Sequence, residues 1–109
     1  MMTIVEKYNA RADAVNSLLC VGLDADISRL DDVYLSEANP QFAFNKAIIE
    51  QTHAYVAAYK PNVAFYEVQG TQGQEALQLT MQYLRDVHPD IVTICDAKRA
   101  DIGNTSEAY

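Results

Sequence analysis

The sequence predicts an α/β protein built around a parallel sheet, because short apolar runs alternate with longer segments of helical periodicity. The apolar runs cover residues 18–23, 57–62 and 91–95, and helical spacing fills the segments before and between them. Charged residues stand at or just after the carboxyl end of each run, and α/β folds place their active and ligand-binding sites at the carboxyl ends of their strands. Three such units favour either a doubly wound sheet or a (β/α)8 barrel.

The first unit starts with a helix that its own sequence caps. Thr3 followed by Glu6 forms a capping box, which predicts a helix over residues 4–16. The first strand follows at 18–23. Residues 24–39 are acidic and irregular, and a stretch of this length indicates a functional loop. Asn39 and Pro40 then predict the start of a second helix, through a capping amide and a proline at the first helical position.

The second and third units repeat this alternation. A second strand is predicted at 57–62, and a turn at 70–73, where Gly70 and Gly73 stand close together. Apolar residues at helical spacing predict a third helix that runs from about residue 76 to 87 and that Pro89 closes. The third strand covers 91–95.

The composition argues against several classes of protein. The net charge is -7 and the pI is about 4.5, which argues against non-specific nucleic-acid binding. Residues 1–14 lack the apolar core of a signal peptide, and no apolar run reaches membrane-spanning length. Cys20 and Cys95 both fall in predicted strands, so we expect buried thiols in a reducing compartment. These features favour a cytoplasmic protein.

A missing motif and the chain length bear on the choice between the two α/β architectures. No glycine-rich phosphate fingerprint follows the first strand, which weakens the dinucleotide-binding fold. A complete (β/α)8 barrel takes roughly 250 residues. We therefore expect residues 1–109 to be the N-terminal portion, about three βα units, of a single (β/α)8 barrel domain.

The sequence places its densest charge after the third predicted strand. Asp96 and Lys98 are two residues apart, so on an extended backbone their side chains project from the same face. Asp101 follows where the chain can turn back towards them. Such a charge cluster at the end of a buried strand is costly unless its members pair or perform chemistry.

In combination, four segments resemble the orotidine 5'-phosphate decarboxylase family, in its longer bacterial branch. The resemblance covers nearly the whole chain, and its two most specific motifs are the segments that contain Lys60 and Lys98. The segments are LCVGLD at 19–24, NP at 39–40 with FNKAII at 44–49, AYKPNVAFYE at 58–67 and DAKRADIGNT at 96–105.

This resemblance implies a (β/α)8 barrel that is active as a homodimer, without metal or organic cofactor. It implies a carboxy-lyase that converts orotidine 5'-monophosphate to uridine 5'-monophosphate in pyrimidine biosynthesis. Asp24 and Lys60 would then hold the ribose hydroxyls. The charge array at the reacting carbon would consist of Lys60, Asp96, Lys98 and Asp101, with Lys98 as the proton donor. The residues that would reach into the partner subunit's site are Asp101, Ile102 and Thr105.

Two alternatives remain open at this stage. Sugar-phosphate decarboxylases and synthases of the same barrel group share the DxKxxD strand but use Mg²⁺. Lys60 argues against them, since a cation there opposes metal binding. The second alternative is that the chain serves as an inactive half-barrel module. Because the phosphate-binding parts of the family lie downstream of Tyr109, we expect these 109 residues alone to be inactive. A separate chain that supplies the remainder of the barrel is one arrangement that this expectation allows.

Overall fold

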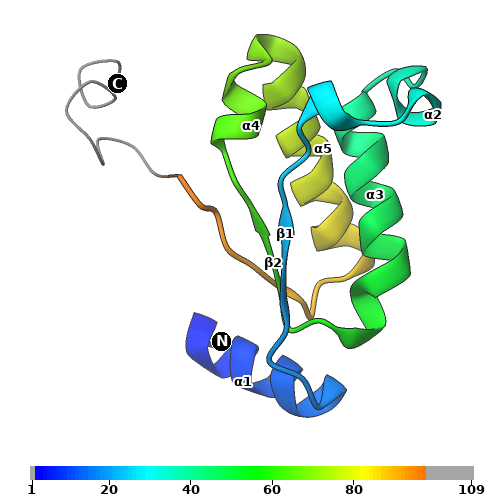
Figure 1. Cartoon of the computed structure of the whole chain (residues 1–109). Coiled ribbons are helices and arrows are strands. Elements are labelled where there is room, and N and C mark those ends of the chain that lie inside the picture. Colours follow the sequence, from blue (N-terminus) through cyan, green and yellow to red (C-terminus); the bar gives the residue numbers. More distant parts are fainter. Residues whose placement is uncertain (1, 98–109) are drawn as a thin grey trace.

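The computed structural model describes residues 2–97 and confirms an α/β fold with three parallel strands (Figure 1). The strands are β1 (Cys20–Leu23), β2 (Ala58–Pro61) and β3 (Val92–Thr93), in the spatial order β1-β2-β3. Both pairings are parallel, and Cys20 lies opposite Ala58, which in turn lies opposite Val92. The chain therefore passes twice from one strand to its neighbour through a helical connection.

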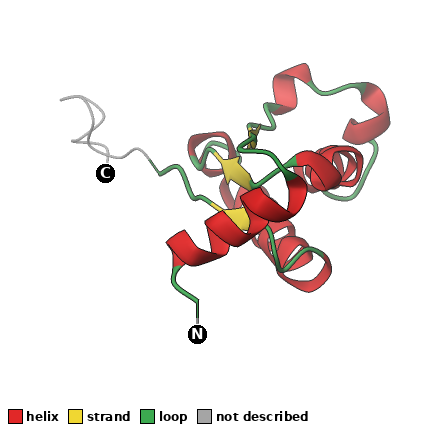
Figure 2. Ribbon diagram, turned by 90° about the horizontal axis from the view of Figure 1, so that it is seen from below, coloured by secondary structure: helices red, strands yellow, loops and turns green. Residues whose placement is uncertain are grey.

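The helices occupy one side and one end of this sheet. They are α1 (Ile4–Val15), α2 (Asp32–Leu35), α3 (Pro40–Thr52), α4 (Ala64–Glu67) and α5 (Gly70–Val87), with 3₁₀ turns at Ile27–Arg29 and His53–Tyr55. The long helices α3 and α5 lie side by side along the strands, whereas α1 crosses near the strands' amino ends (Figures 1 and 2). None of the helices in residues 2–97 is long and apolar enough to cross a membrane.

The helix boundaries follow the predicted caps. The Thr3 hydroxyl accepts a hydrogen bond from the Glu6 amide, the Glu6 carboxylate accepts one from the Thr3 amide, and Asn16 ends α1 in the left-handed conformation. Asn39 caps α3 by accepting a hydrogen bond from the Phe42 amide, and Pro40 follows as the first helical residue. These local predictions are confirmed because each depends on neighbouring residues alone.

Two predicted boundaries were wrong. Gly70 and Gly73 were expected to form a turn, yet both belong to the first turn of α5. Gly70 has a φ of 63°, which makes the bend out of α4, and helical backbone follows at once. The third strand is two residues long instead of five, although Asp96 still bridges to Asn62 further along. The acidic stretch 24–39 contains the 3₁₀ turn Ile27–Arg29 and α2.

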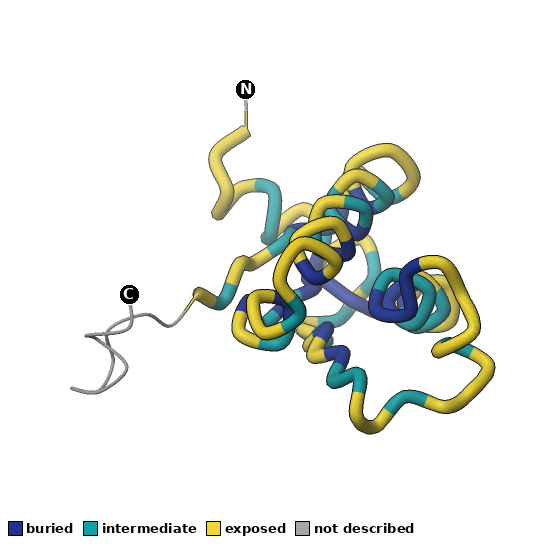
Figure 3. Tube along the Cα trace, turned by 90° about the horizontal axis from the view of Figure 1, so that it is seen from above, coloured by how far each residue is buried: buried dark blue, intermediate teal, exposed yellow. Residues whose placement is uncertain are grey.

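The two faces of the sheet differ in burial. Paired residues and residues two apart along a strand share a face. One face, here called the covered face, carries Leu23 and Tyr59, which are buried in one cluster with Ile49 of α3 and Leu84 of α5. Figure 3 shows these buried segments gathered at the centre of the molecule.

The opposite side is here called the open face. It carries, by alternation and register, Cys20, Gly22, Asp24, Ala58, Lys60, Asn62, Val92, Ile94 and Asp96. Ala58 and Val92 are buried at the end near α1, but Cys20 and Ile94 are exposed. The prediction of buried thiols was therefore wrong. Cys20 lies on the outer strand β1 of the open face, and Cys95 lies beyond the short third strand, where it too is exposed.

Candidate active site

Three charged residues meet at the carboxyl edge of the open face. Gly22 lies opposite Lys60 and Asn62 lies opposite Asp96, so the register places Asp24, Lys60 and Asp96 on one face at one edge. Each comes from a different βα unit, and only the parallel pairing brings them together. The structure thus gathers the described members of the predicted site: Asp24, Lys60 and Asp96.

Lys60 and Asp96 form an ion pair across β2 and the segment after β3. Lys60 Nζ lies 3.7 Å from Asp96 Oδ2, and the side chains are 44% and 14% exposed. The backbone fixes Asp96, because its amide donates to the Pro61 carbonyl at 3.0 Å and its carbonyl accepts from the Val63 amide at 3.0 Å. A half-exposed pair of this kind adds at most about 1 kcal/mol to stability. The geometry orients the ammonium far more than it stabilises the fold.

The Asp24 carboxylate lies next to Gly22, a residue of β1 that has no side chain. A Cβ atom at Gly22 would stand 3.5 Å from Asp24 Oδ2, so the carboxylate occupies the space above Gly22, beside the strand that carries Lys60. Asp24 is exposed and forms no ion pair with Lys60 within 4.0 Å. The carboxylate is thus available to a ligand on the open face.

Asp26, and not Asp24, caps the turn that follows β1. Its Oδ1 accepts hydrogen bonds from the Ser28 amide at 3.0 Å and the Ser28 hydroxyl at 2.7 Å. These two hydrogen bonds, with Arg29 nearby, lower the pKa of Asp26. Asp26 therefore supplies the cap of this turn, and none of the hydrogen bonds or ion pairs given for the described residues engages the Asp24 carboxylate in a structural role.

A buried polar network lies directly behind Asp24, and sequence reasoning missed it. The Tyr66 hydroxyl donates to the Leu23 carbonyl at 2.6 Å, and the Gln41 amide donates to the Ala25 carbonyl at 2.9 Å and to the Phe65 carbonyl at 2.8 Å. Burial raises the pKa of Tyr66 to about 12; the Asp24 carboxylate also raises it, against a lowering hydrogen bond from an asparagine of α3.

The network continues away from the site into α3 and α5. Asn45 donates to Tyr66 Oη at 2.8 Å and to the Thr80 hydroxyl at 3.0 Å, and Thr80 donates to the Ala76 carbonyl at 2.8 Å. Gln41 and Asn45 are four residues apart in α3, so one helix face carries both amides. That spacing was visible in the sequence, but it gives no sign of which carbonyls the amides would reach.

Four predicted site residues lie outside the described residues. They are Lys98, Asp101, Ile102 and Thr105, and their roles remain predictions. Among residues 2–97, no three His, Cys, Asp or Glu side chains gather closely enough to hold a metal ion.

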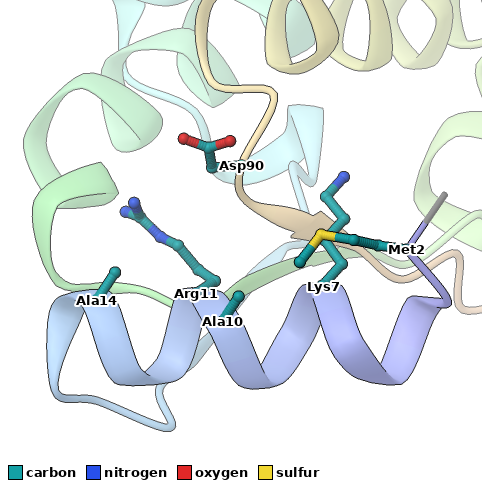
Figure 4. A pocket seen from close by; sticks show the side chains of 6 residues that line it. All are labelled: Met2, Lys7, Ala10, Arg11, Ala14 and Asp90. Atoms are coloured by element: carbon teal, nitrogen blue, oxygen red, sulfur yellow. The ribbon is translucent and has the colours of Figure 1, made fainter.

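A separate hollow lies at the opposite end of the sheet, between α1 and the segment before β3. It is lined by Met2, Lys7, Ala10, Arg11, Ala14 and Asp90 (Figure 4). Arg11 is already engaged there, since it donates to the Val56 carbonyl at 3.0 Å and to the His53 carbonyl at 2.5 Å. This hollow lies near the amino ends of the strands, whereas Asp24, Lys60 and Asp96 lie at the carboxyl edge, so the two sites are separate.

Comparison with known proteins finds a family match for most of the chain. Residues 17–109 match the family described as Orotidine 5'-phosphate decarboxylase / HUMPS family. The orotidine 5'-phosphate decarboxylase of Christiangramia forsetii is 57% identical over 93 residues, which are 85% of this chain and 34% of that protein. The Porphyromonas gingivalis enzyme of the same name is 50% identical over 108 residues, 99% of this chain and 39% of that protein.

A comparison with solved structures also finds an OMP decarboxylase. The OMP decarboxylase of Leishmania donovani superposes with a TM-score of 0.71 at 42% identity, covering 99% of this chain and 38% of that one. The chain therefore spans little more than a third of the length of the relatives it matches.

Proposed function

The chain belongs to the Orotidine 5'-phosphate decarboxylase / HUMPS family, and we propose that it supplies the N-terminal third of a barrel that decarboxylates orotidine 5'-monophosphate. The observation that carries this proposal is the Lys60–Asp96 ion pair beside Asp24, on the open face at the carboxyl edge. That edge is where barrel enzymes bind their substrates. The named decarboxylases among the relatives support the same reaction.

The proposed chemistry uses a charge array and no cofactor. The bond between C6 of the pyrimidine and its carboxylate breaks, CO2 leaves, and the electron pair stays on C6. The Lys98 ammonium stabilises that charge and transfers its proton to C6, which leaves a neutral amine that solvent reprotonates. Asp96 and Asp101 flank the ammonium and keep it charged. Asp24 and Lys60 hold the ribose hydroxyls.

The alternative within the family is a Mg²⁺-dependent sugar-phosphate enzyme. The Lys60 ammonium stands 3.7 Å from Asp96, where it competes with a metal ion for the carboxylate. This contact favours the metal-independent reaction. Activity after exhaustive chelation separates the two, since a loss that Mg²⁺ restores would favour the sugar-phosphate branch.

The test needs a whole barrel. We define the completed barrel as this chain joined, after Tyr109, to the part of the Christiangramia forsetii relative that lies beyond its matched segment. Lys98→Ala in the completed barrel should lower turnover by several orders of magnitude and leave the fold intact. Arg99→Ala removes a neighbouring positive charge and should retain turnover, since the resemblance to the family gives Arg99 no role in the charge array. Near-parental turnover of Lys98→Ala would reject the assignment.

We propose further that the active form is a homodimer with shared sites. If Asp101 serves the partner's site, a mixture of Lys98→Ala and Asp101→Ala subunits contains heterodimers with one intact site. Activity after subunit exchange should then rise well above that of either parent. Demonstrated heterodimers without recovered activity would reject the shared site.

We expect the 109 residues alone to have no decarboxylase activity, because they span little more than a third of the relatives' length. Addition of the remaining part as a separate chain should restore activity if the two associate. An active preparation of residues 1–109 alone would overturn this expectation.

A further inference from the structure

The segment that carries Asp24 is held from behind by the buried network. Leu23 and Ala25, on either side of Asp24, are buried, whereas the Asp24 side chain is exposed on the open face. Tyr66 Oη donates to the carbonyl of Leu23 and Gln41 Nε2 donates to the carbonyl of Ala25. The peptide group before Asp24 and the peptide group after Ala25 are therefore held by side chains of α4 and α3, respectively.

The same network ties this segment to the strand that carries Lys60. Gln41 Nε2 also donates to the Phe65 carbonyl in α4, and α4 begins four residues after Lys60. Helix α5 packs closely against α4 at Gly73, where a Cβ atom would overlap the Tyr66 carbonyl oxygen. The ends of β1 and β2 thus share one buried support on the covered side.

The phenol of Tyr66 is suited to a permanent donor role. Burial raises its pKa to about 12, so the hydroxyl keeps its proton at every pH where the protein would work. Tyr66 and Gln41 are each 1% exposed, and neither touches the open face. Within residues 2–97, the contacts given for these two side chains lead to the open face through the backbone on either side of Asp24.

We infer that Tyr66 and Gln41 are positioning residues that set the Asp24 carboxylate for recognition of ribose hydroxyls. The inference rests on the proposed function, in which Asp24 binds those hydroxyls. It adds a specificity consequence. Loss of the Tyr66 hydroxyl should weaken binding of ribonucleotides selectively, because a nucleotide without ribose hydroxyls never used the Asp24 contact.

The experiment compares two probes on the completed barrel: uridine 5'-monophosphate and its 2',3'-dideoxy analogue. The parent should bind the ribonucleotide at least about tenfold more tightly, because hydrogen bonds to a charged carboxylate are among the stronger polar contacts in proteins. Tyr66→Phe should lose most of that preference by weakening ribonucleotide binding, with the affinity for the dideoxy analogue unchanged. Gln41→Met should behave in the same way, which keeps the test usable if either variant fails to fold.

Tyr59→Phe is the matched control. It removes an equally buried tyrosine hydroxyl, one that contacts the Thr52 hydroxyl at 2.7 Å and the Ile49 carbonyl at 3.3 Å, away from Asp24. A general loss of stability would act alike in both tyrosine variants, so the ribose preference should persist in Tyr59→Phe.

The outcomes separate the inference from the function beneath it. If the parent shows a ribose preference that Asp24→Asn abolishes but Tyr66→Phe and Gln41→Met retain, the positioning role is rejected and the proposed function stands. If the parent shows no ribose preference, or Asp24→Asn keeps it, the proposed role of Asp24 is rejected and the inference falls with it.

Discussion

The covered face and the open face of one three-stranded sheet are built from the same strands but by different rules. On the covered face, Leu23 and Tyr59 pack against the long helices in a closed apolar cluster. On the open face, Cys20 and Ile94 are exposed and the charged residues gather at one edge. The alternation of side chains along each strand therefore separates the apolar core from the proposed site, although the residues of both are neighbours in the sequence.

The largest effect is expected on the covered face. Leu84→Ala in the completed barrel should lower the free energy of unfolding by about 2–5 kcal/mol, because it removes a buried side chain from the cluster that α3 and α5 make with the sheet. Urea denaturation measures the change. Val33→Ala on exposed α2 is the control and should cost less than about 0.5 kcal/mol. Equal costs at both positions would mean that the covered face is not the core.

The next effect tests whether the open face separates chemistry from stability. Lys60→Met should lower kcat/KM of the completed barrel about 10²–10³-fold, by removal of a positioned cation. Its unfolding free energy should change by less than about 1 kcal/mol, since the Lys60 side chain is 44% exposed. Lys46→Met, at an exposed residue of α3 whose ammonium lies 5.6 Å from the Tyr83 ring centroid, provides the matched loss of charge. It should leave kcat/KM unchanged and cost less than about 1 kcal/mol. A large loss of stability in Lys60→Met would contradict the separation.

A third prediction asks whether the open face stays open. Ile94 is 42% exposed in this chain. If the remaining strands close a barrel over this face, its side chain becomes interior, and Ile94→Ala should then cost about 2 kcal/mol or more in the completed barrel. Denaturation midpoints of parent and variant measure the difference. A cost below about 0.5 kcal/mol would show that this face does not become a barrel interior.

The smallest effect concerns the rim of the covered side. His88 stacks on His53 with ring centroids 4.3 Å apart. Burial lowers the pKa of His88; His53 and Arg11 lower it further, and Glu50 opposes them. Below about pH 6.5, the unfolded state therefore binds more protons at this residue than the folded state does, and stability falls as the pH falls.

His88→Gln should reduce that dependence on pH. Because the ring is partly exposed, we expect the contribution to be smaller than about 1 kcal/mol between pH 7.5 and 5.5. Urea denaturation at these two pH values, on parent and variant, measures it. The carboxylates keep their own pH dependence in both proteins, so identical slopes would remove His88 as a contributor.

The sequence predicted the strands and the edge of the site because both depend on short-range patterns. Apolar runs located β1, β2 and the start of β3, and charges at or just after the ends of those runs located Asp24, Lys60 and Asp96. Parallel register then brings together whatever follows the strands, with no need for knowledge of their long-range contacts.

The rest depended on contacts between distant segments. Gln41 and Tyr66 looked like ordinary helical residues, because no local signal tells which carbonyls their side chains will reach. The glycines at 70 and 73 looked like a turn, because the close approach of α4 and α5 that requires Gly73 is a tertiary event. Cys20 was placed inside by its apolar neighbours, but its exposure depends on which face the helices cover.

The order β1-β2-β3 has a consequence for how such a barrel is made. The central strand β2 finds both its neighbours within the described residues, and the covered face closes with helices that lie between those strands in sequence. A ribosome adds about 5–20 residues per second, and domains fold as their segments emerge. In the completed barrel we therefore expect these three strands to assemble first, with their two outer edges left to pair with the strands that follow.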